Sequence, residues 1–149
     1  MAMSQGESVA ALIGRCTLAW FFLMMTYRYG YDWNSTAILL AMKGIPAAPV
    51  LLFAGLAANI LGSISLLLGS HARIGALALF VVTIASTLSV YDYWNISAAA
   101  VLAREAAFDI FARNVAIAGG LLLLIGIGPG RFALDNQASA VHHAHAAAR

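Results

Sequence analysis

The chain has 149 residues, of which 62% are hydrophobic and 9% are charged, and its formal net charge is +2. Because a soluble domain has roughly 25% charged residues, this composition excludes an ordinary soluble domain and indicates an integral membrane protein. The length allows about four membrane spans with no separate water-soluble domain, and the charge distribution does not indicate a nucleic-acid-binding surface.

The apolar runs predict an all-α fold, a four-helix membrane bundle with a short interfacial helix between spans one and two. We expect one transmembrane domain over residues 1–135, with spans at about 9–27, 47–69, 74–91 and 108–127. The N-terminus lacks the basic start and cleavage site of a removed signal peptide, so we expect it to be retained. Residues 136–149 are rich in Ala and His and are expected to form a flexible tail.

The first span contains Arg15, which lies near enough to the helix start to extend to the headgroups; a functional buried arginine is the alternative. An aromatic belt is expected at the far end of this span. After it, Asn34 or Ser35 can cap a helix at about 36–43, which Gly44 and Pro46 would end.

The second span carries small residues at three- and four-residue steps, which places them on one helix face. In lipid, close backbone approach over small residues holds helices together, so this face is expected to pack against another helix. Asn59 is the only amide side chain of the span and needs a partner inside the protein, such as the hydroxyls at 83–87. The predicted packing residues are Gly55, Ala58, Asn59, Gly62, Ser65 and Gly69.

The connection between spans two and three indicates how these two spans pack. The turn at residues 70–73 is so tight that spans two and three should be antiparallel neighbours. The fourth apolar run is the shortest, so it must include part of 108–113 to cross the bilayer, and residues before 108 are expected to approach along the interface. His142, His143 and His145 lie in the tail without a carboxylate or cysteine that would complete a ligand set, so no metal site is predicted.

Polar and aromatic residues gather on the side of the bundle opposite the termini, and they form the best candidate site. A quinone needs a flat apolar slot with hydrogen-bond donors at its carbonyl oxygens, and Arg, Asn and Tyr beside aromatic walls supply these parts. An ordinary aromatic belt with an i,i+4 pair between Asp109 and Arg113 is the structural alternative. The candidates for quinone or lipid binding are Tyr27, Arg28, Asp92, Tyr93, Trp94, Arg113 and Asn114.

Three segments in order, IGRCTLAWFF, KGIPAAPVLLFAGLAANILGSISLLLGSHARIGALAL and NVAIAGGLLLLIGIGPGRFALD, resemble the DoxX family of small four-span bacterial and archaeal membrane proteins. The resemblance covers most of residues 13–135. It rests on Arg15, the turn 44–46, Leu68-Gly69 followed by Arg73, and Asn114 followed by two glycines. It implies quinone-linked respiratory chemistry in a plasma membrane, with quinone as a borrowed cofactor and no covalently bound cofactor.

Two positions depart from that family. The chain has Arg28 where members often carry a lysine, and Asn59 where they often carry a glutamate. An amide forms hydrogen bonds but cannot exchange protons as a carboxylate does, so a proton-coupled mechanism through position 59 is not expected.

Three functions are compatible with the sequence. The first is a membrane subunit of a quinone-linked oxidoreductase, active only within a complex with other membrane subunits. The second is a non-catalytic accessory or scaffold subunit of a larger membrane complex. The third, a small transporter, is least favoured because Asn59 alone is clearly a polar residue at mid-span. The Lys and Arg residues are divided equally between the two sides, and their closeness to span ends favours cytoplasmic termini.

Overall fold

The computed structural model describes residues 5–130, 132 and 133, which form five α-helices, one 3-10 turn and no strand. The elements are α1 Gln5–Tyr31, α2 Trp33–Met42, α3 Ala48–Leu68, α4 Ala72–Val90, η1 Tyr93–Asn95 and α5 Val101–Ile127. The predicted all-α fold is confirmed. The predicted tail at 136–149, with its three histidines, lies outside the described residues.

Four of these helices, α1, α3, α4 and α5, are long and apolar enough to cross a membrane. The chain is therefore a multi-pass membrane protein. Helices α1 and α5 have 27 residues each, about 40 Å, so they extend beyond a hydrocarbon core of about 30 Å. The approach to the fourth span is part of α5 itself, because the helix is continuous from Val101.

The short helix between the first two spans is present as α2, but it begins earlier than the sequence predicts. Its N-cap is Asp32, which makes no side-chain capping bond, so neither Asn34 nor Ser35 caps it. None of its residues is buried. The predicted end is observed: Gly44 adopts a positive φ of 74° just after the helix, and Pro46 follows.

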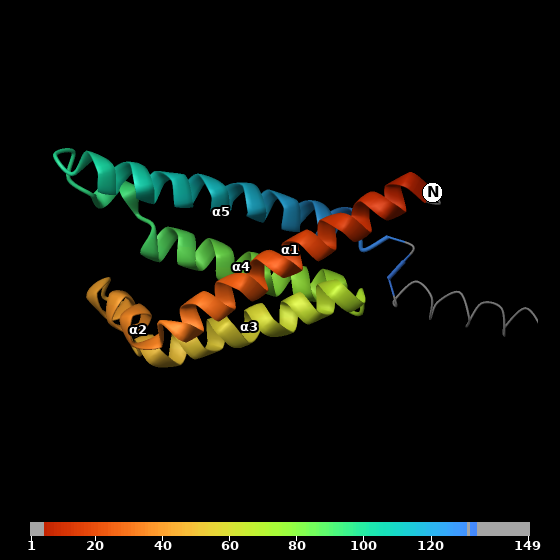
Figure 1. Cartoon of the computed structure of the whole chain (residues 1–149), viewed down its shortest axis with the longest axis horizontal. Helices are drawn as coiled ribbons and strands as arrows, with labels where there is room; N and C mark the ends of the chain where they lie inside the picture. The colour runs from red at the N-terminus through yellow and green to blue at the C-terminus, as the bar shows by residue number, and fades with distance from the viewer. Residues whose placement is uncertain (1–4, 131, 134–149) are drawn as a thin grey trace, which may run out of the picture.

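The helices form an open arrangement in the order α1, α3, α4, α5, as Figure 1 shows. Helix α3 packs along both α1 and α4, α4 packs along α5, and α1 and α5 make few contacts. Four crossings bring the start of α1 and the end of α5 to the same end of the bundle, whereas α2 lies at the opposite end against α3 (Figure 1). Whether the terminal end faces the cytoplasm stays a prediction.

The end of the bundle where α1 begins and α5 ends is tightly packed, and we call it the terminal half. A Cβ placed on Gly62 of α3 would lie 2.6 Å from Leu79 Cγ and 3.1 Å from the carbonyl oxygen of Gly75 on α4. Such distances mean that the two backbones are in contact there, which only glycine permits. Buried apolar residues of α1, α3, α4 and α5 form one cluster: Ala19, Phe22, Leu66, Ala76, Leu79, Leu121 and Leu124.

The turn between α3 and α4 makes these two helices antiparallel neighbours, as its length predicts. Gly69 ends α3 in the left-handed conformation, with φ 67°, and its N–H donates to the Ser65 carbonyl at 2.9 Å. The Ser65 hydroxyl donates to the Ser70 carbonyl at 2.7 Å, which fixes the turn.

Arg15 differs from its predicted position. Its side chain is only 1% exposed, so it does not extend to the surface. A Cβ on Gly69 would collide with Arg15 Nη1 and would lie 2.7 Å from Ala133 Cα. The arginine therefore lies in the space that glycine leaves between α1, the α3–α4 turn and the segment after α5.

Candidate functional site

An apolar cavity of about 440 Å³ occupies the other end of the bundle, which we call the cavity half. This volume is in the range of sites for small ligands. Its wall is built mainly from α1, α2, α3 and α4, and α5 contributes one residue, Asn114. The apolar wall includes Phe21, Phe22, Met25, Leu39, Leu40, Ile45, Leu52, Leu56 and Val82.

The cavity exists because α3 and α4, which are in contact at Gly62, lie farther apart toward the start of α3. A Cβ on Gly55, two turns earlier on α3, would have its nearest neighbour, Val82 Cγ1, at 4.0 Å. Leu51 of α3 and Val81 of α4 line the cavity and are also half or more exposed. The cavity therefore has an opening between these two helices, on a surface of apolar side chains that would face lipid.

Asn59 is a buried polar side chain in the cavity wall. It is 8% exposed, and its Oδ1 accepts no hydrogen bond from the residues that the structure describes. The expected hydroxyl partners on α4 bond within their own helix instead: Thr83 donates to the Leu79 carbonyl at 2.7 Å, and Ser86 to the Val82 carbonyl at 2.8 Å. Asn59 Oδ1 is thus a buried acceptor in the cavity wall, with no donor among the described residues.

Two tyrosines join α1 to the end of α4 at the cavity wall. The hydroxyl groups of Tyr29 and Tyr91 are 2.8 Å apart, and either can donate to the other. Both rings line the cavity. This pair bridges helices that are distant in sequence, so it helps to define the outer end of the cavity.

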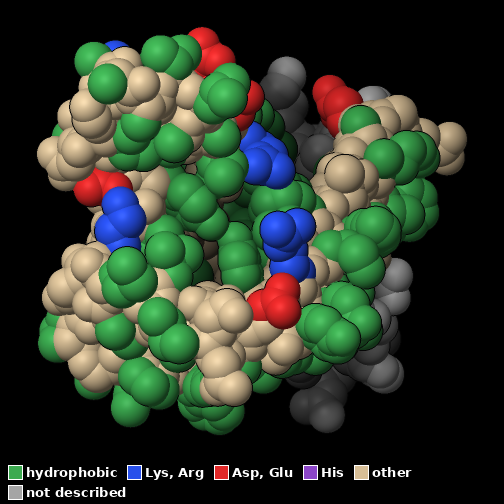
Figure 2. All heavy atoms as spheres, turned by 60° about the vertical axis from the view of Figure 1, so that its left-hand side comes forward, with side chains coloured by type: hydrophobic (Ala, Val, Ile, Leu, Met, Phe, Trp, Pro, Cys, Tyr) green, Lys and Arg blue, Asp and Glu red, His purple; other side chains and the backbone are tan. Residues whose placement is uncertain are grey.

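Charged side chains of both signs surround the cavity half where it meets the membrane surface. Figure 2 shows this end: the surface is hollowed at its centre, the hollow has a hydrophobic lining, and Lys or Arg side chains lie at its rim. Arg28 and Arg113 are exposed, and both interact electrostatically with Tyr91. Lys43, directly after α2, forms an ion pair with Asp92, whose second oxygen accepts a hydrogen bond from Asn95 at 2.8 Å.

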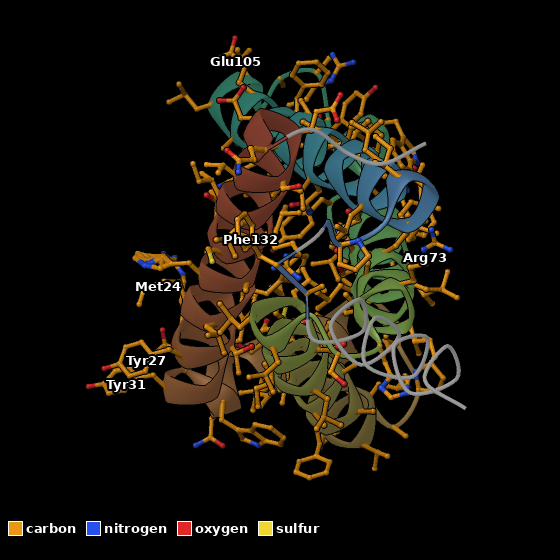
Figure 3. The ribbon with its side chains drawn as sticks, turned by 90° about the vertical axis from the view of Figure 1, so that its right-hand side faces the viewer. Met24, Tyr27, Tyr31, Arg73, Glu105 and Phe132 are labelled. Atoms are coloured by element: carbon orange, nitrogen blue, oxygen red, sulfur yellow. The ribbon has the colours of Figure 1, made fainter. Side chains whose placement is uncertain are left out.

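The structure separates the sequence-predicted site residues into different places. Asn114 lines the cavity, whereas Arg28 and Arg113 come directly before the cavity residues Tyr29 and Asn114. Tyr27 is 70% exposed and stacks on Tyr31, with ring centroids 6.2 Å apart; both project away from the bundle in Figure 3.

The aromatic residues of the α4–α5 connection form a cluster of their own. The Tyr93 ring lies 5.2 Å from Phe108 and 5.3 Å from Phe111, and Trp94 lies 5.8 Å from Phe111, all in edge-to-face geometry. This packing fixes the connection to the start of α5. Tyr93, Trp94 and Asp92 do not contribute to the cavity wall.

The predicted packing residues of α3 also face different parts of the structure. Gly62 and Asn59 are buried, and a Cβ on Gly75 would lie 2.6 Å from Ser65 Oγ, so Gly62 and Ser65 face α4. Gly69 contacts Arg15 and Ala133 at the turn. The remaining two, Gly55 and Ala58, are half-buried, and Gly55 lines the cavity.

The hydroxyl pair Tyr29–Tyr91 was not among the predicted site residues. The helical spacing of α1 nevertheless indicates that Tyr29 faces the inside of the bundle. The buried positions Arg15, Ala19 and Phe22 of α1 continue at steps of three and four to Tyr29 and not to Tyr27. Among residues 5–130, 132 and 133, no group of three or more His, Cys, Asp or Glu side chains is placed to hold a metal ion.

The sequence model of the SURF4 family matches residues 4–140, nearly the whole chain. The resemblance to the DoxX family is therefore wrong as an assignment. Its motifs consist mostly of glycine, alanine and leucine, which recur in membrane helices because close packing requires them, whatever the family. No curated protein and no solved structure matches the chain.

Proposed function

The chain belongs to the SURF4 family, and we propose that its membrane bundle binds a lipid-soluble molecule whose headgroup carries a hydrogen-bonding oxygen. The observation that carries this proposal is Asn59, a buried amide in the wall of a mostly apolar cavity that opens between α3 and α4. The opening gives access from the bilayer, and the volume of about 440 Å³ accommodates a ring or part of a chain.

A buried amide oxygen without a hydrogen bond destabilises a fold by about 1–3 kcal/mol, and a ligand O–H that donates to Asn59 Oδ1 removes that cost. A quinol or lipid hydroxyl can make this bond, whereas a quinone carbonyl or a lipid ester can only accept one from the amide nitrogen. The aromatic and aliphatic wall stabilises the apolar part of the same molecule.

The identity of this ligand distinguishes two more specific functions, an oxidoreductase subunit and an accessory or scaffold subunit. A bound quinone would make the chain the membrane subunit of a quinone-linked oxidoreductase, working with other membrane subunits. A bound lipid would favour an accessory or scaffold subunit whose fold or assembly depends on that lipid. With the DoxX assignment withdrawn, the quinone proposal rests on the cavity alone.

The test is native mass spectrometry of the purified chain after mild delipidation, with a decyl-tailed ubiquinone analogue and phospholipids added back. We expect one retained molecule per chain in the wild type. Asn59→Leu should lose it without a loss of stability, because Asn59 Oδ1 has no hydrogen bond within the described residues to give up. Gly55→Leu should also lose it, because the new side chain fills the cavity.

Gly119→Leu is the matched control, because position 119 is exposed on α5 and a Cβ there meets nothing within 4 Å. It should retain the ligand. Equal retention by Gly55→Leu, Asn59→Leu and Gly119→Leu would show that the molecule binds elsewhere and would overturn the proposal.

A further inference from the structure

Two polar side chains of α3, Asn59 and Ser63, are buried inside the bundle with unpaired oxygen atoms. Asn59 is 8% exposed and Ser63 is fully buried, and neither Asn59 Oδ1 nor Ser63 Oγ has a hydrogen-bond partner among the described residues. They are four residues apart in a continuous helix, so they lie on the same face of α3, one turn from each other. The pair combines a buried acceptor with a buried hydroxyl, which can donate and accept.

Ser63 differs in this respect from other hydroxyl side chains of the spans. Thr26, Thr83 and Thr87 each donate to the carbonyl oxygen four residues earlier in the same helix. The corresponding oxygen for Ser63 is the Asn59 carbonyl, and Ser63 Oγ makes no hydrogen bond to it. Because an unpaired buried polar group is unfavourable, the pair is suited to a molecule that bonds to both side chains.

The pair also marks the inner end of the cavity. Asn59 is the last residue along α3 that lines the cavity, and Ser63 lies one turn beyond it, beside Gly62, where α3 and α4 are in contact. A molecule in the cavity therefore meets Asn59 with the end that it places deepest. The rest of the molecule can extend toward the start of α3, where the exposed Leu51 lies at the opening.

The lining of the cavity limits the headgroup of that molecule. Within the described part of the chain, the residues that line it include no Lys, Arg, Asp, Glu or His side chain. A charged headgroup beside Asn59 would lose its hydration without gaining an opposite charge. A phospholipid could place only an acyl chain there, which makes no hydrogen bond, and a carbonyl or ester offers no donor to Asn59 Oδ1. A hydroxyl group is small and neutral, and it can both donate and accept.

We propose that the cavity binds a neutral apolar alcohol with its hydroxyl group innermost. The O–H donates to Asn59 Oδ1, and the same oxygen accepts a hydrogen bond from Ser63 Oγ. This inference rests on the proposed function and names the class of its ligand. A long-chain alcohol and a quinol share this chemistry, and the experiment distinguishes between them.

The experiment measures, by native mass spectrometry, how well the whole chain in detergent retains two matched pairs of probes. Hexadecanol is compared with its methyl ether, which lacks the donor, and a decyl-tailed ubiquinol, kept reduced without air, is compared with the corresponding quinone. We expect the wild type to retain the alcohol about tenfold better than the ether, the effect of one hydrogen bond. Stronger retention of the quinol than of hexadecanol would identify an aromatic ligand, and the reverse an aliphatic one.

Two variants test the two side chains. Asn59→Leu should retain hexadecanol no better than the ether, and Ser63→Ala should weaken retention of hexadecanol several-fold, because each removes one of the two proposed bonds. Ser63→Ala should not lower thermal stability, because Ser63 Oγ has no hydrogen bond within the described residues to lose. Ser35→Ala is the matched control, since Ser35 is exposed on α2 and does not line the cavity. It should bind as the wild type does.

The outcomes separate the two proposals. If the wild type retains the ether as well as hexadecanol and the quinone as well as the quinol, in a manner sensitive to Gly55→Leu, the cavity binds a ligand without selecting a donor, and only this inference fails. If Ser63→Ala retains hexadecanol as well as Ser35→Ala does, the paired recognition of the hydroxyl is wrong. If no probe is retained in a manner sensitive to Gly55→Leu, the proposed function itself fails.

Discussion

Helices α3 and α4 are in backbone contact in the terminal half of the bundle and lie farther apart in the cavity half. In the terminal half, Gly62 faces Gly75 and the two backbones touch; in the cavity half, Gly55 faces Val82, and a Cβ added to Gly55 would approach it no closer than 4.0 Å. A small residue on one helix brings two backbones together only when its neighbour is also small. At Gly55 no such contact forms, and the space there is part of the cavity.

The largest expected effect is the difference in stability between Gly62→Leu in the terminal half and Gly55→Leu in the cavity half. Gly62→Leu should destabilise the bundle by about 3 kcal/mol, the upper end of the usual cost of overpacking, because even a Cβ there would lie 2.6 Å from Leu79. Gly55→Leu should change stability little, because its side chain has the cavity to occupy. Thermal unfolding in one detergent measures both.

Equal loss of stability in Gly62→Leu and Gly55→Leu would show that the two halves are packed alike and that the cavity is not open space. If neither variant lost stability, the contact between Gly62 and Gly75 would not hold the helices together, and the described packing would be wrong.

A smaller effect is expected at two of the glycines with positive φ, Gly69 in the terminal half and Gly44 after α2. Alanine at either position adds the strain of a left-handed backbone, about 1–2 kcal/mol. Only Gly69→Ala also meets atoms, Arg15 Nη1 and Ala133 Cα, whereas a Cβ on Gly44 meets nothing within 4 Å.

We therefore expect Gly69→Ala to lower the free energy of unfolding more than Gly44→Ala does, by about another 1 kcal/mol, a typical cost of overpacking. The difference between the two variants isolates the contact with Arg15 from the backbone strain they share. Equal costs would mean that Arg15 can move away freely, and the tight packing of the terminal half would not extend to this turn.

The fold followed from properties that a sequence shows directly. Apolar runs of sufficient length indicated the spans, and the short 70–73 segment indicated the antiparallel pairing of α3 and α4. The small-residue spacing on α3 identified Gly62, but it did not distinguish Gly62 from Gly55, because the outcome depends on whether Gly75 or Val82 lies opposite. Which residue of α4 lies opposite depends on how the two helices are aligned along their lengths, and no local pattern shows this alignment.

The candidate site was harder to predict because composition near a span end does not show which way a side chain points. Tyr27 and Tyr29 are two residues apart, about 200° around the helix, so one projects away from the bundle and the other lines the cavity. The Lys43–Asp92 ion pair joins residues 49 positions apart, and no local pattern indicates it. Arg15 was misjudged because its neighbours, Gly69 and Ala133, come from distant parts of the chain.

The smallest expected effect concerns the hydroxyl bond between Tyr29 and Tyr91, which joins α1 to α4 at the outer end of the cavity. Removing either hydroxyl should cost about 1 kcal/mol or less of unfolding free energy, the net worth of a typical hydrogen bond. Tyr29→Phe and Tyr91→Phe, alone and together, form a double-mutant cycle, and the combined loss should equal one single loss because both substitutions break the same bond. Phenylalanine keeps the rings that line the cavity, so the two single variants should retain a neutral ligand. Additive losses would show that the hydroxyls bond to different partners, and the cavity half would then be open at this end as well as between α3 and α4.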